Sequence, residues 1–341
     1  MIALVLLLLA LPQSGRLVVL NKAEASASLL DLGTGSERAR LPVGLGPHEV
    51  AVSPDGRFAV VANYGGAVPG SSLTLVDLVA EKPLRTLDLG TETRPHGIVY
   101  DLDGTHVWVT AEERKSLLRV RVADGAVVQE IATPEPIGHM VVRDHTGRLF
   151  VSHIGGGGVT PVTGGHFSWT ADAFVPTGKG AEGIALSPDS RNLWVGHRED
   201  HNVVVLNTAS MKPLATLPAA GFPIRVQITP DGGTALVSCA QAGVLRFYDT
   251  VTLEETGALD FSAQVKADRA GGRLLDEFGD SPVPIGIVIT PDGARAYVAL
   301  ANADRIAEVD LTKRAVARWL KAGREPDGMA WYPAPTAAPV R

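Results

Sequence analysis

Residues 47–66 read PHEVAVSPDGRFAVVANYGG. Two apolar runs, EVAVS and FAVVAN, flank a corner whose Pro-Asp-Gly sequence is typical of a tight turn. This pattern predicts a β-hairpin. A hairpin does not itself require a histidine at its entrance, so the role of His48 depends on what lies around the hairpin.

The same hairpin recurs along the chain. Equivalent corners occur at residues 53–56 (SPDG), 101–104 (DLDG), 144–147 (DHTG), 187–190 (SPDS), 229–232 (TPDG) and 290–293 (TPDG). The last residues of successive corners are 48, 43, 43, 42 and 61 positions apart. A period of roughly 42 to 45 residues indicates one four-stranded propeller blade per repeat.

The two ends of the chain complement each other. Near the N-terminus, RLVVLN, ASASLLDL and ARLPVG have the character of a second, third and outer strand, while the C-terminal PDGMAWYPAP has that of a first strand. Together they form one more blade, which closes the ring and removes exposed strand edges. We therefore predict an all-β, seven-bladed β-propeller with four-stranded blades, a single domain over residues 16–335, and a tail at 336–341.

Charge and composition exclude some partners. The 341 residues carry a net charge of −6, with no basic stripe for a phosphate backbone, so we expect no nucleic-acid partner. The single cysteine, Cys239, cannot form an internal disulfide and is expected to be a buried small hydrophobe.

The N-terminus is apolar from Ile2 to Leu11, followed by Pro12 and small polar residues. This length fits the core of a signal peptide and falls short of the ~20 residues of a membrane span. No Lys or Arg precedes the run and no small-x-small cleavage site follows it, which leaves an uncleaved anchor as the alternative. We predict a signal peptide at residues 1–15 and an exported monomer (periplasmic, secreted or cell-surface) without a membrane span in the mature chain.

Two repeat positions are expected to reach the rim of the central channel, a concave place that suits a small-molecule ligand. The start of the first strand gives His48, His96, His139, Glu182, Ile224, Ile285 and Asp327. The end of the second strand gives Asn21, Asn63, Ala111, His153, His197, Cys239 and Leu300. Five of the nine histidines in the chain fall on these positions, which predicts a histidine-rich site.

Converging imidazoles beside a carboxylate suit a transition metal such as Zn, Cu or Fe. The predicted metal ligands are His48, His96, His139, His153 and His197. Glu182 and Asp327 are the predicted anionic ligand or base, and Arg225 is the predicted anion-recognising residue. A metal-bound water can attack a carbonyl or phosphoryl group. Alternatively, each histidine fills space between blades and bonds a backbone carbonyl.

The unit between the last two corners is the longest, and its surplus falls at residues 260–281, DFSAQVKADRAGGRLLDEFGDS. By strand order this insertion connects an outer strand to the next inner strand, on the same rim as the histidines. Its Arg269, Arg273, Asp276 and Glu277 are candidates for clamping an anionic substrate or covering the metal. A solvated surface loop is the alternative.

PHEVAVSPDGRFAVVANYGG, GAEGIALSPDSRNLWVGH and PIGIVITPDGARAYVALAN resemble the YVTN-type (YncE-like) repeat of secreted and cell-surface seven-bladed propellers. The resemblance extends over nearly the whole chain after the N-terminal apolar run. The segment VANYGG also resembles a blade of the lactonase-like propellers related to 6-phosphogluconolactonase, which implies ester or lactone hydrolysis.

The sequence thus predicts a metal-dependent hydrolase that acts on a small-molecule ester or lactone at the channel mouth. A non-enzymatic binding or scaffold propeller, at the cell surface or in the periplasm, is the alternative that the YVTN resemblance implies. A copper- or iron-dependent oxidoreductase is the second alternative.

Overall fold

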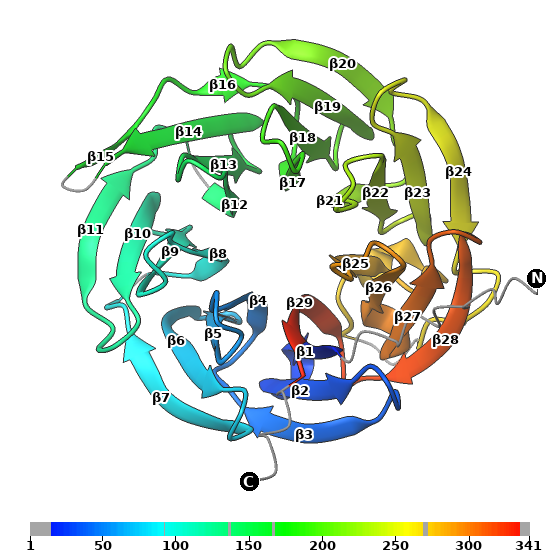
Figure 1. Ribbon diagram of the computed structural model, residues 1–341, viewed down its shortest axis with the longest axis horizontal. Helices are drawn as coiled ribbons and strands as arrows, with labels where there is room; N and C mark the ends of the chain where they lie inside the picture. Colours follow the sequence, from blue (N-terminus) through cyan, green and yellow to red (C-terminus); the bar gives the residue numbers. More distant parts are fainter. Residues whose placement is uncertain (1–14, 92, 136–137, 166–167, 269–271, 335–341) are drawn as a thin grey trace, which may run out of the picture.

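The computed structural model describes residues 15–91, 93–135, 138–165, 168–268 and 272–334. Within these ranges, seven antiparallel sheets form a ring around a central channel (Figure 1), which confirms the predicted seven-bladed β-propeller. Three expectations fall outside the described residues: the signal peptide apart from Gly15, the C-terminal tail, and Arg269 of the insertion. Among the described residues, no helix is long and apolar enough to cross a bilayer.

The first four blades follow one another in sequence. Blade 1 contains β4 (Pro47–Val52), β5 (Phe58–Gly65), β6 (Pro69–Asp77) and β7 (Lys82–Asp88). Blade 2 contains β8 (Pro95–Tyr100), β9 (His106–Ala111), β10 (Ser116–Arg121) and β11 (Val127–Ala132). Blade 3 contains β12 (Gly138–Arg143), β13 (Leu149–His153), β14 (Gly158–Gly164) and β15 (Trp169–Ala171), with a short β16 (Val175–Pro176) also paired to β14. Blade 4 contains β17 (Ala181–Leu186), β18 (Asn192–His197), β19 (Asn202–Asn207) and β20 (Pro213–Pro218).

Blades 5 to 7 complete the ring. Blade 5 contains β21 (Pro223–Ile228), β22 (Thr234–Cys239), β23 (Val244–Asp249) and β24 (Glu255–Asp260). Blade 6 contains β25 (Pro284–Ile289), β26 (Arg295–Leu300), β27 (Arg305–Asp310) and β28 (Ala315–Lys321). Blade 7 contains β29 (Pro326–Pro333), β1 (Gly15–Asn21), β2 (Ser26–Asp31) and β3 (Glu37–Pro42). Three 3-10 turns are η1 (Lys22–Glu24), η2 (Asp276–Phe278) and η3 (Ala301–Ala303).

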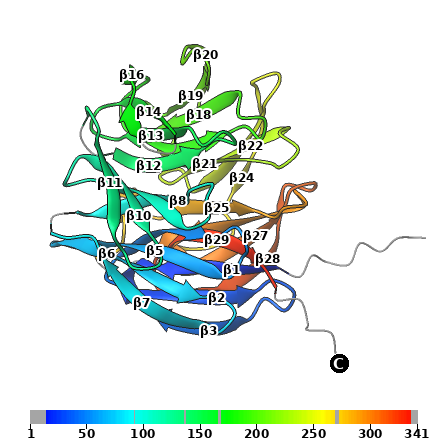
Figure 2. The same cartoon turned by 60° about the vertical axis from the view of Figure 1, so that its left-hand side comes forward.

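Blade 7 closes the ring by joining the two ends of the chain. Strand β29 pairs antiparallel with β1, with Tyr332 opposite Arg16 and Ala330 opposite Val18. The two strands lie side by side in both views of the ring (Figures 1 and 2). The predicted blade of one C-terminal and three N-terminal strands is therefore confirmed.

The hydrophobic core lies between the blades. Successive side chains of a strand point to opposite faces, so Val60 and Ala62 of β5 pack against blade 2, whereas Ala59 and Val61 pack against blade 7. Both faces of each second strand are buried in this way. This explains why these strands read as continuous apolar runs.

The recurrent corner has its own side-chain support. The Ser53 hydroxyl donates to Oδ1 of Asp55 at 2.5 Å and accepts the backbone N–H of Phe58 at 2.9 Å, while the same Asp55 oxygen accepts the N–H of Arg57. Thr229 and Asp231 repeat the arrangement in blade 5. These bonds fix the turn from the first to the second strand of the blade.

Each inner strand is irregular near its start. In β4, for example, the pairing with β5 shifts between Pro47 and Val50, and β8, β12, β17, β21 and β25 shift at the equivalent place. Such a bulge interrupts the alternation and turns a side chain away from the sheet face. The residues at these bulges are those expected at the channel rim.

Candidate functional site

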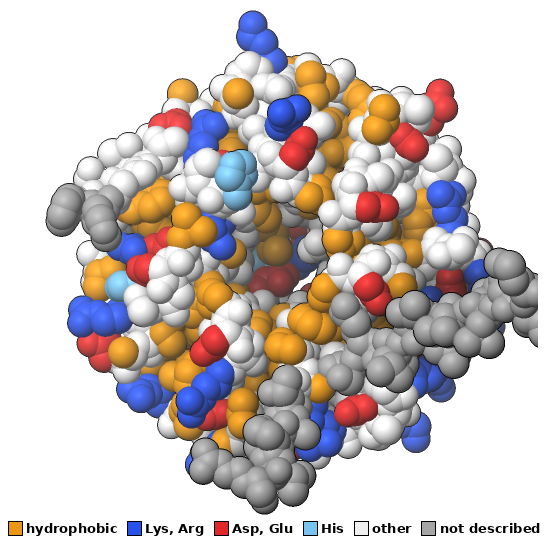
Figure 3. All heavy atoms as spheres, viewed as in Figure 1, with side chains coloured by type: hydrophobic (Ala, Val, Ile, Leu, Met, Phe, Trp, Pro, Cys, Tyr) orange, Lys and Arg blue, Asp and Glu red, His pale blue; other side chains and the backbone are white. Residues whose placement is uncertain are grey.

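A cavity of about 490 Å³ lies around the central channel, where the first strands of the blades begin. Seen from the other end of the strands, the ring is hollowed at its centre (Figure 3). All seven residues expected from the starts of the first strands line this cavity: His48, His96, His139, Glu182, Ile224, Ile285 and Asp327. The inner-strand bulges place them there. Residues more than 270 positions apart in sequence therefore share one site.

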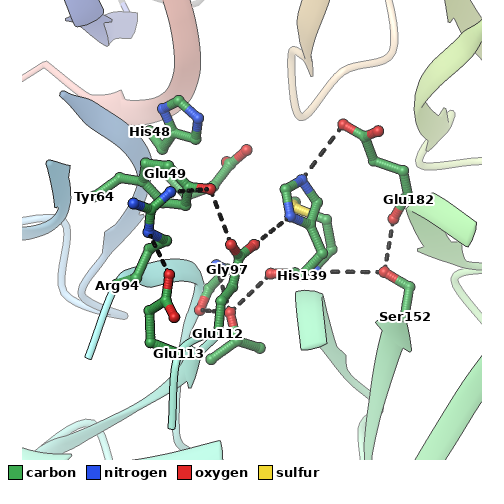
Figure 4. Close-up of polar contacts among 12 residues, drawn as sticks. His48, Glu49, Tyr64, Arg94, Gly97, Glu112, Glu113, His139, Ser152 and Glu182 are labelled. Carbon is green, nitrogen blue, oxygen red and sulfur yellow. Dashed lines mark hydrogen bonds and ion pairs between the residues drawn. The ribbon is translucent and has the colours of Figure 1, made fainter. Parts of the chain in front are cut away.

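His139 lies between two carboxylates (Figure 4). Its Nδ1 donates to Oε1 of Glu112 at 2.6 Å, and its Nε2 lies 3.4 Å from Oε1 of Glu182. The Tyr64 hydroxyl donates to the other oxygen of Glu112 at 2.9 Å. Burial alone would lower the pKa of His139, but the two carboxylates outweigh it and raise that pKa. Burial and the Glu112 charge raise the pKa of Tyr64 to about 12.

Glu182 is held by cations on its other side. Its Oε1 accepts from Arg225 at 3.0 Å and its Oε2 from Arg198 at 2.9 Å. Burial would raise the pKa of Glu182, but the His139 hydrogen bond and the neighbouring cations lower it to about 2. Arg225 also donates to Glu49 at 2.7 Å, and this bond joins blade 5 to blade 1 across the channel. Burial opposes the charge of Arg225, but Glu49 and Glu182 together raise its pKa above the usual value.

His48 belongs to a second polar group. Its Nε2 lies 3.2 Å from Nζ of Lys22 and its Nδ1 lies 3.4 Å from Oδ2 of Asp327. Its ring stacks on Tyr64 with a centroid separation of 4.4 Å. Burial, and then the charge of Lys22, lower the pKa of His48 well below its usual value. Burial raises the pKa of Asp327.

His96, Glu112 and His139 could together hold a metal, with the ion taking the place of the proton between His139 Nδ1 and Glu112. Each of these buried residues offers one ligand atom, and the three atoms lie within 4.8 Å of one another. The His96 and His139 rings are 3.5 Å apart between centroids. Among the described residues, Nδ1 of His96 has no hydrogen-bond partner, and burial lowers the pKa of this ring well below its usual value. A neutral imidazole nitrogen without a partner is what a transition metal requires.

The expectation that five histidines converge is corrected for two of them. His153 and His197 are buried but do not line the cavity. His197 lies 2.7 Å from the Thr177 hydroxyl and 3.0 Å from the Asn202 side chain, and the His153 ring packs edge-on against Phe174. Both residues end a second strand, where the side chain enters the space between blades.

In five of the seven blades, the residue that follows this position reaches the cavity instead. These residues are Lys22, Tyr64, Glu112, Ile154 and Arg198, and all five line the wall. The alternation of side chains along a strand could have predicted these positions, because a residue that follows an interblade side chain points in the opposite direction. Our sequence reasoning used the position one residue too early and so missed Glu112.

Among its described residues, the insertion contributes apolar side chains to the cavity wall. Leu274 and Leu275 line the cavity. Arg273 is only 5% exposed and binds Asp304 at 2.6 Å as well as Asp268. Arg273 therefore anchors the insertion to blade 6 and is not free to clamp an anionic substrate, whereas Arg269, the other arginine of the expected clamp, lies outside the described residues.

Comparisons with known proteins support the fold. The chain matches no family model and no curated protein. Among solved structures, it resembles the periplasmic gluconolactonase PpgL of Pseudomonas aeruginosa (18% identity, TM-score 0.72, 94% of this chain and 99% of that one). It also resembles a functionally unknown protein from Desulfotomaculum acetoxidans (11%, 0.75, 94% and 100%) and the hydrazine synthase of Kuenenia stuttgartiensis (18%, 0.68, 88% and 93%).

These structures share the propeller architecture with this chain, and some are enzymes. At such low identity the likeness shows the fold alone. The resemblance to the YVTN-type repeat stays a prediction from the sequence.

Proposed function

We propose that this protein is a metal-dependent hydrolase that cleaves small-molecule esters or lactones in the cavity at the channel mouth. The observation that supports this proposal is the buried trio of His96, Glu112 and His139 on the wall of a cavity of about 490 Å³. Three protein ligands with open positions are the usual composition of a catalytic zinc site.

In this proposal, His96, Glu112 and His139 hold the metal, which is Zn, Cu or Fe. When bound, such an ion supplies Lewis acidity toward a carbonyl oxygen and lowers the pKa of coordinated water. Glu182 and Arg225 act as positioning residues, because their contacts fix His139 from the side opposite Glu112.

Asp327 and His48 are the proposed proton acceptor. Among the described residues, Oδ1 of Asp327 is buried without a hydrogen-bond partner, while Oδ2 faces Nδ1 of His48. Water adds to the acyl carbon and the bond from that carbon to the alkoxy oxygen breaks. One proton of the water passes through this pair to the leaving oxygen, giving an acid and an alcohol, or a hydroxy acid from a lactone.

A second candidate is a binding propeller without catalysis. The observation in its favour is that hydrogen bonds and one ion pair join Tyr64, Glu112, His139, Glu182 and Arg225 into a continuous polar chain. Such a network rigidifies a ligand pocket on its own.

Metal analysis of untagged protein separates the two candidates. We expect about one equivalent of a transition metal in the wild type, and loss of most of it in His96→Ala and Glu112→Gln. His145→Ala is the matched control, because this histidine lies on an exposed corner and contacts Ser190. Circular dichroism checks that each variant is folded. A metal content that is zero in the wild type, or the same in His96→Ala, would favour the binding propeller.

We also propose export of the chain and action as a monomer, with residues 16–335 as one domain. The apolar run Ile2–Leu11 supports export. Cell fractionation with N-terminal sequencing of the mature protein tests the first point, and sedimentation equilibrium tests the second.

A further inference from the structure

The cavity wall has one sector that the proposed chemistry does not use. It consists of five apolar side chains: Phe222 and Ile224 of blade 5, Leu274 and Leu275 of the insertion, and Ile285 of blade 6. These residues pack together as one cluster over Ala240, Val283 and Ala301. The sector is thus continuous with the hydrophobic interior.

This apolar sector faces the candidate metal ligands. His96 and Glu112 come from blade 2, and His139 comes from blade 3. In a ring of seven blades, blades 5 and 6 lie across the channel from blade 2 (Figure 1). A molecule that fills the cavity therefore has a polar wall on one side and an apolar wall on the other.

Contacts with the rest of the protein hold the apolar sector in place. Arg273 fixes the insertion to Asp304, the Leu274 N–H donates to Glu325 at 3.2 Å, and the Phe278 ring packs against Phe222 with centroids 4.9 Å apart.

Two of its members also have unusual backbones. Phe222 (φ 69°) and Leu275 (φ 54°) lie in the left-handed region, which bulky residues rarely adopt. Strain of this kind persists where surrounding contacts hold it, and it clusters at functional sites.

We propose that the substrate is an ester or lactone with an apolar alkyl or acyl substituent, which lies against Phe222, Ile224, Leu274, Leu275 and Ile285 while the scissile carbonyl faces His96, Glu112 and His139. The proposal rests on the hydrolase function proposed above. A polyhydroxylated substrate fits less well, because hydroxyl groups against five apolar side chains would lose their hydrogen bonds to water without replacement.

The first experiment measures hydrolysis of 4-nitrophenyl acetate, butyrate, hexanoate and octanoate by purified protein of known metal content. Each buried methylene contributes about 0.8 kcal/mol, so kcat/KM is expected to rise about fourfold per added carbon until the sector is covered. In Leu275→Gly, the factor by which kcat/KM rises per added carbon is expected to fall toward one. The ratio of kcat/KM for hexanoate to that for acetate is expected to fall at least tenfold. Glycine suits the φ of this position, so the variant is not expected to unfold. Leu214→Ala, on an exposed outer strand, is the matched control.

The second experiment measures binding of butanoate, hexanoate and octanoate by calorimetry, independently of turnover. Affinity is expected to rise with chain length in the wild type and in Leu214→Ala, but not in Leu275→Gly. Ester turnover with no chain-length dependence overturns the substrate class and leaves the hydrolase in place. Chain-length-dependent binding without turnover of any ester supports the apolar sector and rejects the hydrolase. If the protein shows neither ester turnover nor chain-length-dependent binding, both the substrate class and the hydrolase function are rejected.

Discussion

Arg225 connects three blades through a single side chain. It extends from blade 5 and binds Glu182 of blade 4 and Glu49 of blade 1. Arg225 and Glu182 are buried and the Glu49 side chain is 13% exposed, so each charge depends on the others in place of water. Such a buried network contributes little net stability when complete, yet removal of one member leaves a charge without compensation.

We predict that Arg225→Met destabilises the protein by about 3–5 kcal/mol at pH 7, measured by urea unfolding, because Glu182 and Glu49 lose their shared partner. Replacing both carboxylates by Gln in the same chain is expected to restore part of the loss. Arg191→Met is the matched control: this exposed residue lies 3.8 Å from Asp189, and its loss is expected to cost less than about 1 kcal/mol. An Arg225→Met variant as stable as this control would contradict the prediction.

Only some site residues are readable from the sequence. His48, His96 and His139 share one repeat position, so counting from the corner was sufficient to place them together. Arg225 and Glu49 lie 176 residues apart in different blades. They share the repeat position that follows His48 and Ile224, but a shared position does not predict which of its members touch. Their contact depends on how far a long side chain reaches across the channel, which the strand pattern does not contain.

The residues at the ends of the second strands were expected at the channel rim, and the geometry of the strand explains why this prediction failed. Asn63 lies near the end of β5, and its side-chain amide bonds Ser72, Thr74 and the N–H of Gly44, all within the blade or the connection that leads into it. His197 occupies the same position in blade 4. Alternation sends these side chains between blades and sends the next residue to the cavity. The pattern predicted where each strand ends, but assigned the wrong face to its last residue.

At the corners, we predict a stability contribution that depends on pH. The hydrogen bond from Thr229, and then the N–H of Gly233, lower the pKa of Asp231 in the folded state; Ser53 and Thr290 lower the pKa of Asp55 and Asp292 in the same way. A pKa that is lowered on folding stabilises the protein above the unfolded value, about 3.8, and this stabilisation is lost as pH falls through the folded value.

The triple variant Asp55→Asn, Asp231→Asn, Asp292→Asn tests this directly. Its urea midpoint is expected to lie below that of the wild type at pH 7, by a modest amount because the corners are exposed to solvent. The two midpoints are expected to approach each other as pH falls below 3.8, where the wild-type carboxylates become protonated. A difference that stays constant with pH would show that the carboxylate charge has no part in it.

At the scale of the whole molecule, stability depends on closing the ring. Without β29, strand β1 would expose a row of unpaired backbone groups, and the interblade cores on both sides of blade 7 would be opened. We predict that a chain ending at Arg324 aggregates or unfolds without a cooperative transition, as measured by size-exclusion chromatography and thermal unfolding. A chain ending at Ala334 keeps all of β29 and serves as the control. A monomeric, cooperative Arg324 variant would contradict this view of closure.

The strand that closes the ring also carries Asp327 to His48, beside Lys22 at the end of β1. This side of the cavity is therefore complete only when β29 has paired with β1. Opening the ring at this seam would separate Asp327 from His48 and Lys22 even if blades 1 to 6 stayed intact. A ligand that contacts Asp327 and His48 together would therefore also stabilise the closed ring.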